Sequence, residues 1–213
     1  MILNKDSALQ VAEFLLQIKA IIIRPKEPFK WASGWKSPVY CDNRKTLSYP
    51  LIRTYIRQQL TAAVDERFGK PDVIAGIATG GIAQGVLVAE ELGVPYIYIR
   101  PQAKDHGLGN LIEGSVESGQ SIILIEDLIS TGKSSLLALE IVRDAGCIVK
   151  GLVSIFTYGF DVSVQNFKTN NCPVVSLCDY NALIAKAVET NYIKESDIVI
   201  LDRWRENPAE WMG

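Results

Sequence analysis

Apolar residues recur every three or four positions in several stretches of the chain, a spacing typical of amphipathic helices. In one stretch, Ile52, Ile56, Leu60, Val64 and Phe68 stand four positions apart and would lie along one helix face. Helices with one face against a core are predicted over 7–19, 50–68, 137–145 and about 181–190.

Short, almost uninterrupted apolar runs alternate with these helices, as expected for strands that are buried on both faces of a parallel sheet. The predicted strands are 73–77, 96–99, 122–125, 149–156 and 174–177. The first strand is followed by Thr79-Gly80-Gly81 and a further helix that ends near Gly93. This order of strand, turn and helix predicts an α/β fold with a mostly parallel, twisted sheet flanked by helices.

The two ends of the chain depart from this alternation. Residues 28–43 are rich in aromatic residues, Gly and Pro, and predict short strands around a turn at Ser33-Gly34. The run Ile198–Leu201 would suit a strand, but Ser196 resembles an N-cap and Trp204 continues a helical spacing, so a helix is expected. No repeat or long linker divides the 213 residues, so we expect a single domain.

Charge and composition narrow the possible partners. The 22 Lys and Arg residues and 24 Asp and Glu residues give a net charge of −2, so no overall positive field would attract nucleic acid or an anionic membrane. No apolar run approaches the roughly 18–20 residues that span a bilayer. The first ten residues lack the order of a secretory signal, so a cytoplasmic protein is expected.

Cysteine and histidine usage excludes several kinds of site. The four cysteines are scattered, without the paired spacing of zinc ligands, and are predicted to be reduced thiols. His106 is the only histidine, so a site that needs two imidazoles is excluded.

The most informative segment follows the predicted strand 122–125. Ligands of open α/β sheets bind beyond the carboxyl ends of the strands. Here the strand is followed by Glu126, Asp127 and a turn of small residues that opens a helix. Backbone N–H groups of 130–135 would form a cradle for a phosphate monoester, and the two acids would accept hydrogen bonds from vicinal hydroxyls or help to hold a hydrated cation. The segment therefore predicts a site for ribose 5-phosphate.

Two other interpretations of this segment remain. Gly132-Lys133-Ser134 imitates the end of a nucleoside-triphosphatase phosphate loop, but Asp127 stands where that motif has its first glycine. The segment could also be only a helix start after a buried strand. Two consecutive acids at a strand end argue against this plainer interpretation.

Residues 122–135 resemble the phosphoribosyl-pyrophosphate motif of the type I phosphoribosyltransferases. Residues 29–44 and 100–107 resemble the N-terminal substrate segment and the mobile catalytic loop of one group within that family, the orotate phosphoribosyltransferases. The resemblance covers most of the chain and implies a single domain, 1–213, with the type I fold. It implies a small N-terminal substrate-binding hood at about 1–45, a core at about 46–190 and a C-terminal tail at about 191–213.

The implied activity is transfer of ribose 5-phosphate from phosphoribosyl pyrophosphate (PRPP) to orotate, with Mg²⁺ as cofactor. The products would be orotidine 5′-phosphate and pyrophosphate, in pyrimidine (UMP) biosynthesis. Alternatives are a purine or other type I phosphoribosyltransferase, and a non-catalytic, nucleotide-sensing regulator of the same fold.

The resemblance also implies roles for individual residues. Catalytic roles fall to Lys104, His106 and Asp127. PRPP would be bound by Arg100, Lys104, His106, Glu126, Asp127, Leu128, Ile129, Ser130, Thr131, Gly132, Lys133 and Ser134. The pyrophosphate loop would be Ala78, Thr79, Gly80 and Gly81, and orotate would contact Ser130, Phe29 and Tyr40. The ion would be held mainly by substrate and water rather than directly by the protein. A homodimer that shares the loop 100–110 between subunits is implied.

The chain departs from some relatives at three positions. Ala32 and Pro101 stand where those relatives carry lysines, and near the position of Tyr158 those relatives carry an arginine that meets the orotate carboxylate. The cation that neutralises this carboxylate is therefore left open, with Lys36 and Arg44 as candidates.

Overall fold

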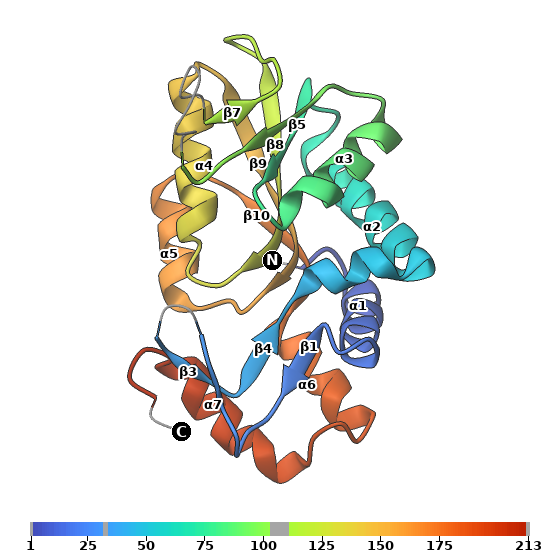
Figure 1. Cartoon of the computed structure of the whole chain (residues 1–213), viewed down its shortest axis with the longest axis vertical. Coiled ribbons are helices and arrows are strands. Elements are labelled where there is room, and N and C mark those ends of the chain that lie inside the picture. Colours follow the sequence, from blue (N-terminus) through green and yellow to red (C-terminus); the bar gives the residue numbers. More distant parts are fainter. Residues whose placement is uncertain (1, 32–33, 103–110, 212–213) are drawn as a thin grey trace.

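A six-stranded sheet runs through the molecule, with helices on both faces (Figure 1). The computed structural model describes residues 2–31, 34–102 and 111–211. Along the sheet the strands lie in the order β10 (Val174–Asp179), β9 (Ile148–Thr157), β8 (Ser121–Ile129), β5 (Val73–Ile77), β6 (Tyr96–Ile99) and β7 (Ile112–Glu113). All neighbouring pairs are parallel except β6 and β7. The predicted α/β fold with a mostly parallel sheet is confirmed.

The helices cover the two faces of this sheet. The described helices are α1 (Lys5–Gln17), α2 (Pro50–Phe68), α3 (Gly81–Leu92), α4 (Lys133–Asp144), α5 (Asp161–Thr169), α6 (Tyr180–Glu189) and α7 (Ile198–Glu206), with a 3₁₀ turn, η2 (Glu195–Asp197), before the last. In Figure 1, α2 and α3 lie on the right of the sheet, and α4 and α5 lie on its left. Every helix predicted from the spacing of apolar residues is present, including the helix near the C-terminus. Helix α5 was not predicted.

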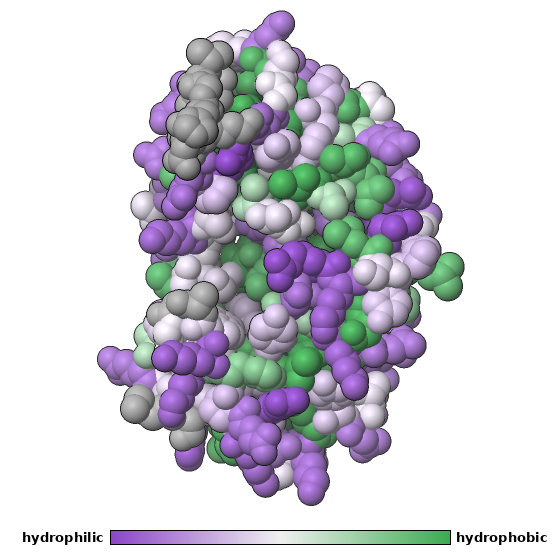
Figure 2. Space-filling model, viewed as in Figure 1, coloured by the Kyte–Doolittle hydropathy of each residue, from purple (hydrophilic) through white to green (hydrophobic). Residues whose placement is uncertain are grey.

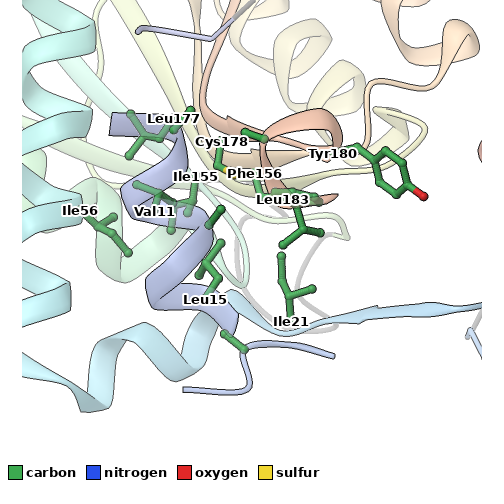
Figure 3. Close-up of a cluster of buried hydrophobic side chains, with 14 of the residues drawn as sticks. Val11, Leu15, Ile21, Ile56, Ile155, Phe156, Leu177, Cys178, Tyr180 and Leu183 are labelled. Atoms are coloured by element: carbon green, nitrogen blue, oxygen red, sulfur yellow. The ribbon is translucent and has the colours of Figure 1, made fainter. Parts of the chain in front are cut away.

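A buried cluster joins α1, α2, α6 and one face of the sheet (Figure 3). Helix α1 begins because the Asn4 side chain accepts a hydrogen bond from the Ser7 backbone N–H at 2.8 Å. Its inner face then buries Val11 and Leu15, and α2 contributes Ile56. Full burial of such a side chain stabilises the fold by about 1.5–3 kcal/mol. This cluster holds the sheet, and with it the strand ends, in a fixed position.

Residues 21–48, which we call the 21–48 segment, form a separate layer of short strands. Strands β1 (Ile21–Ile23) and β4 (Val39–Cys41) pair antiparallel, as do β2 (Phe29–Lys30) and β3 (Lys36–Ser37). A 3₁₀ helix, η1 (Asn43–Ser48), follows. In Figure 1 the strands of this segment lie below the sheet, beside α6 and α7. The short strands predicted over 28–43 are confirmed, whereas β1 was not predicted.

Two expectations about strands need correction. The strand predicted over 122–125 continues through Glu126 and Asp127 to Ile129, because β9 pairs with it over this whole length. The acids lie before the turn, as expected, but the strand extends two residues beyond them. The antiparallel β7 was not predicted, since a strand of two residues carries no periodic pattern.

Membrane crossing would need a long apolar helix. Among the described residues, none of the helices has both the length and the apolar composition to cross a bilayer.

Candidate active site

The carboxyl ends of β5 and β8 lie side by side and bring two predicted loops together. Parallel pairing aligns Gly76 with Ile125, so the turn after β5 faces the acids of β8. A Cβ atom on Gly80 would overlap the carboxyl group of Asp127, and one on Gly81 would overlap the carbonyl oxygen of Ile125. Glycine is therefore required at both positions for this close approach. The predicted pyrophosphate loop and the predicted sugar-binding acids are direct neighbours.

Glu126 lies beneath the turn that follows β8. Its side chain is only 4% exposed. Its carboxylate accepts hydrogen bonds from Ser135 Oγ at 3.2 Å, Ser134 Oγ at 3.4 Å and the Asp127 backbone N–H at 3.1 Å. Burial, and then the neighbouring charge of Asp127, raise the pKa of Glu126 well above its usual value. The first acid is thus tied to the start of α4.

Asp127 is less deeply buried and faces the Gly80 loop. Burial raises the pKa of its carboxyl group, a hydrogen bond with Glu126 opposes this rise, and the charge of Arg44 opposes it as well. Its backbone carbonyl accepts a hydrogen bond from Asn43 Nδ2 at 2.6 Å. The second acid is therefore the one in position to meet a ligand beyond the sheet.

The turn between β8 and α4 has the geometry of an anion site. Gly132 has φ +80°, and a Cβ atom there would come within 2.9 Å of the Phe167 ring on α5. Helix α4 begins at Lys133, so its first backbone N–H groups have no partner within the helix and point outward at its positive end. Ser130 and Thr131 are half-buried, whereas Lys133 and Ser134 are exposed. A phosphate group placed at this turn would meet both hydroxyls and N–H donors.

The other PRPP candidates fall in different environments. Leu128 and Ile129 are the last residues of β8, and the Ile129 carbonyl accepts a hydrogen bond from Tyr158 N at 3.0 Å. Arg100 follows β6 and pairs with Glu113, with 3.2 Å between Nη1 and Oε1. Lys104 and His106 lie outside the described residues.

Two of the orotate candidates lie together in the 21–48 segment. The rings of Phe29 and Tyr40 are 5.5 Å apart, and the Arg24 guanidinium stands 5.2 Å from the centre of the Phe29 ring. Figure 2 shows a hollow near the centre of the drawn face, between the sheet and this segment. The third candidate, Ser130, belongs to the turn after β8.

A buried polar connection between the 21–48 segment and the sheet was not predicted. Asn43 is 1% exposed and binds the Asp127 carbonyl, while its own carbonyl accepts a hydrogen bond from Thr46 Oγ1 at 2.6 Å. Gln84 of α3 donates to that same Thr46 oxygen at 3.2 Å. These contacts join residues that are far apart in sequence, so no spacing pattern reveals them.

Tyr158 and Trp31 belong to a buried aromatic cluster. The Tyr158 ring lies 5.3 Å from that of Trp31 and 5.6 Å from that of Trp204, and it stacks on Phe160 at 5.2 Å. Its hydroxyl is buried without a hydrogen-bond partner among the described residues. The Tyr158 side chain, just after the end of β9, therefore contributes an aromatic ring and no charge of its own.

Comparison with known proteins identifies the family. Residues 50–201 match the model of the phosphoribosyl transferase domain. The chain is 54% identical over 200 residues to the orotate phosphoribosyltransferase of Phocaeicola vulgatus, covering 94% of both chains. The chain belongs to the orotate phosphoribosyltransferase family.

Solved structures agree with this family fold. The UMP synthase of Leishmania donovani matches 94% of this chain and 42% of its own, with a TM-score of 0.79 and 25% identity. The orotate phosphoribosyltransferase of Aeropyrum pernix matches 86% of this chain and 99% of its own, with a TM-score of 0.74 and 22% identity. The turn after β8 is the segment whose sequence resembles the PRPP motif of this family.

A metal ion would find few ligands in this part of the chain. The described residues contain no group of three or more His, Cys, Asp or Glu side chains that could hold an ion. Glu126 is buried and engaged with serine hydroxyls, which leaves Asp127 as the carboxylate at the sheet end. This donor set suits an ion carried mainly by substrate oxygens.

Proposed function

We propose that the protein transfers ribose 5-phosphate from PRPP to N1 of orotate, giving orotidine 5′-phosphate and pyrophosphate. The observation that carries this proposal is the contact between Asp127 and the Gly80 loop, beside the start of α4. In this proposal the turn before α4 binds the phosphate, Asp127 accepts hydrogen bonds from the ribose hydroxyls and the Gly80 loop meets the diphosphate, all at one end of the sheet. The identity to orotate phosphoribosyltransferases over almost the whole chain supports orotate as the acceptor.

The chemistry requires the anomeric C–O bond to break while positive charge grows on the ribose and negative charge grows on the leaving pyrophosphate. The turn at 130–135 holds the 5′-phosphate through backbone N–H groups and hydroxyls. Asp127 accepts hydrogen bonds from the ribose hydroxyls and offers a negative charge beside the positive ribose. Glycine at positions 80 and 81 lets the backbone approach the diphosphate.

Mg²⁺ fits this site as an ion bound chiefly to the substrate. Asp127 is the side chain that would face it through water, and the substrate's diphosphate and hydroxyl oxygens would supply most of its shell. When bound, the ion supplies neutralisation of the charge that develops on the leaving group.

The remaining roles follow the family resemblance. The diphosphate would be bound by Lys104, the main catalytic cation, and by His106 and Arg100. To reach it, Arg100 would leave its ion pair with Glu113. We propose a homodimer in which the loop 100–110 enters the partner's site. We also propose that the enzyme acts in the cytoplasm, in UMP biosynthesis, in keeping with the absence of disulfides among its four cysteines.

A spectroscopic assay tests the activity. Orotate loss should require PRPP and Mg²⁺, and removing the ion with a chelator should stop it. Turnover with adenine or hypoxanthine in place of orotate would instead favour a purine enzyme. Binding of PRPP without any turnover would favour a regulator.

The role of Lys104 has its own test. Lys104→Ala should lower kcat far more than it weakens PRPP binding, because the lysine charge is needed most as the leaving group develops. Steady-state kinetics and direct titration of PRPP separate the two quantities. An unchanged kcat would remove Lys104 from catalysis.

A further inference from the structure

The acceptor base brings a charge that the proposed site must meet. Orotate carries a carboxylate on C6, directly beside the N1 atom that bonds to C1′ of the ribose. C1′ in turn adjoins C2′, whose hydroxyl donates a hydrogen bond to Asp127 in the proposed function. A cation for this carboxylate must therefore lie close to Asp127.

Three cations near the site, Lys133, Arg100 and Arg24, lie on the phosphate side of the turn or contact other groups. Lys133 opens α4 on the phosphate side of the turn. Arg100 pairs with Glu113, and Arg24 lies over the Phe29 ring. Tyr158, at the end of β9, is buried among aromatic rings and brings no charge.

Arg44 is held beside Asp127 by its neighbours in sequence. The preceding residue, Asn43, donates to the Asp127 carbonyl at 2.6 Å and is itself buried. Thr46, one residue beyond Lys45, is anchored to α3 through Gln84 at 3.2 Å. The backbone that carries Arg44 is thus fixed on both sides.

The guanidinium of Arg44 is oriented but not enclosed. Its Nε lies 2.6 Å from Oδ1 of Asp42, and the side chain remains 59% exposed. One ion pair uses only part of the five N–H donors of an arginine, so others remain accessible to a ligand. Asp42 first, and Asp127 to a smaller extent, raise the pKa of Arg44, as expected for a cation that faces both acids.

We propose that Arg44 binds the C6 carboxylate of the pyrimidine substrate and product, with Asp42 as the residue that orients its guanidinium. This inference rests on the proposed function and assigns the specificity for a carboxylated base to η1. A planar guanidinium can meet a carboxylate with two parallel hydrogen bonds, which a lysine cannot do.

Two product nucleotides isolate the carboxylate. Orotidine 5′-phosphate carries it, and uridine 5′-monophosphate is the same molecule without it. The wild-type protein should bind the first more tightly by roughly 10–100-fold, the range for a hydrogen bond to a charged group. Arg44→Gln should lose this preference, with weaker binding of orotidine 5′-phosphate and unchanged binding of uridine 5′-monophosphate. Arg44→Lys should keep part of it.

Calorimetric titration of both nucleotides, with the thermal midpoint of each variant, decides between the outcomes. Arg24→Gln is the matched control in the same segment, and Lys36→Gln, the second control, tests the other cation that the sequence offered for this carboxylate; both should keep the wild-type preference. A preference that survives in Arg44→Gln, or is lost in either control, overturns the assignment of Arg44. If the wild-type protein neither prefers orotidine 5′-phosphate nor converts orotate, the proposed function itself fails, whatever the variants do. A weaker affinity of Arg44→Gln for both nucleotides would show a structural role and also overturn the proposal.

Discussion

The sheet end and the 21–48 segment build their parts of the site in different ways. At the sheet end, the chemistry follows directly from consecutive residues, since β8, its turn and the start of α4 run from 121 to 135 without interruption. In the 21–48 segment, strands of two or three residues are held by contacts with distant parts of the chain, such as the packing of Trp31 on Tyr158 and Trp204. The half that we propose for the sugar phosphate is therefore local in sequence, and the half that we propose for the base is not.

This difference predicts how amino-acid substitutions in each half should affect the site. The sheet end is supported by pairing on both sides of β8 and by a buried core, so a substitution there should alter the chemistry of a fixed frame. The 21–48 segment meets that frame at Asn43, so a substitution at this contact should move the base half as a unit. Substitutions in the two halves should thus separate PRPP effects from orotate effects.

Removing the charge of Asp127, the less buried of the two acids, should have the largest effect. Asp127→Asn keeps the shape of the side chain but turns a charged acceptor into a weaker neutral one. A hydrogen bond to a charged group contributes about 1.5–3 kcal/mol, so kcat/KM for PRPP should fall by roughly 10–100-fold. Steady-state kinetics at saturating orotate would measure it. Kinetics equal to those of the parent would contradict a role at the ribose.

A methyl group placed beside Asp127 should have the second-largest effect on activity. Gly80→Ala places a methyl group against the Asp127 carboxyl and should displace it, lowering kcat/KM for PRPP by about 10-fold. The same substitution in an Asp127→Ala background provides the control, because the colliding carboxyl is then absent. The added effect of Gly80→Ala should be much smaller there. Equal effects in both backgrounds would show that the methyl group acts elsewhere.

Prediction from the sequence succeeded where a pattern is repeated locally. The spacing of Ile52 to Phe68 predicted α2 with its observed bounds, and the small-residue turn after the two acids was predicted to open a helix, which the structure shows at α4. It failed where position depends on distant partners. The continuation of β8 through Glu126 and Asp127 depends on pairing with β9, and the role of Asn43 depends on the carbonyl of Asp127, 84 residues away.

Loosening the contact between the halves should affect orotate more than PRPP. Asn43→Ala removes the donor to the Asp127 carbonyl and leaves that oxygen without this partner, at a cost of about 1–3 kcal/mol in the free energy of unfolding. KM for orotate should rise by about 5–10-fold, because the base-binding segment loses its position, while the Kd for PRPP changes little. Asn207→Ala, which removes an exposed Asn207–Glu210 hydrogen bond, is the control and should change neither. A larger change in the PRPP Kd than in the orotate KM would contradict the division between the halves.

The smallest effect should appear in stability rather than rate. Burial raises the pKa of Glu126 in the folded protein, so folding favours its protonated form, and this contribution is lost as pH rises from the unfolded pKa through the folded one. Glu126→Gln removes the buried charge and should raise the thermal midpoint at pH 8, by about 2–4 °C for each kcal/mol relieved. The gain should shrink toward pH 4, where the wild-type side chain is protonated as well. Glu140→Gln, on the exposed side of α4, is the matched control and should show no such trend across a calorimetric pH series. A midpoint for Glu126→Gln that is lower than wild type at pH 8 would mean that the hydrogen bonds from Ser134 and Ser135 outweigh the burial of the charge.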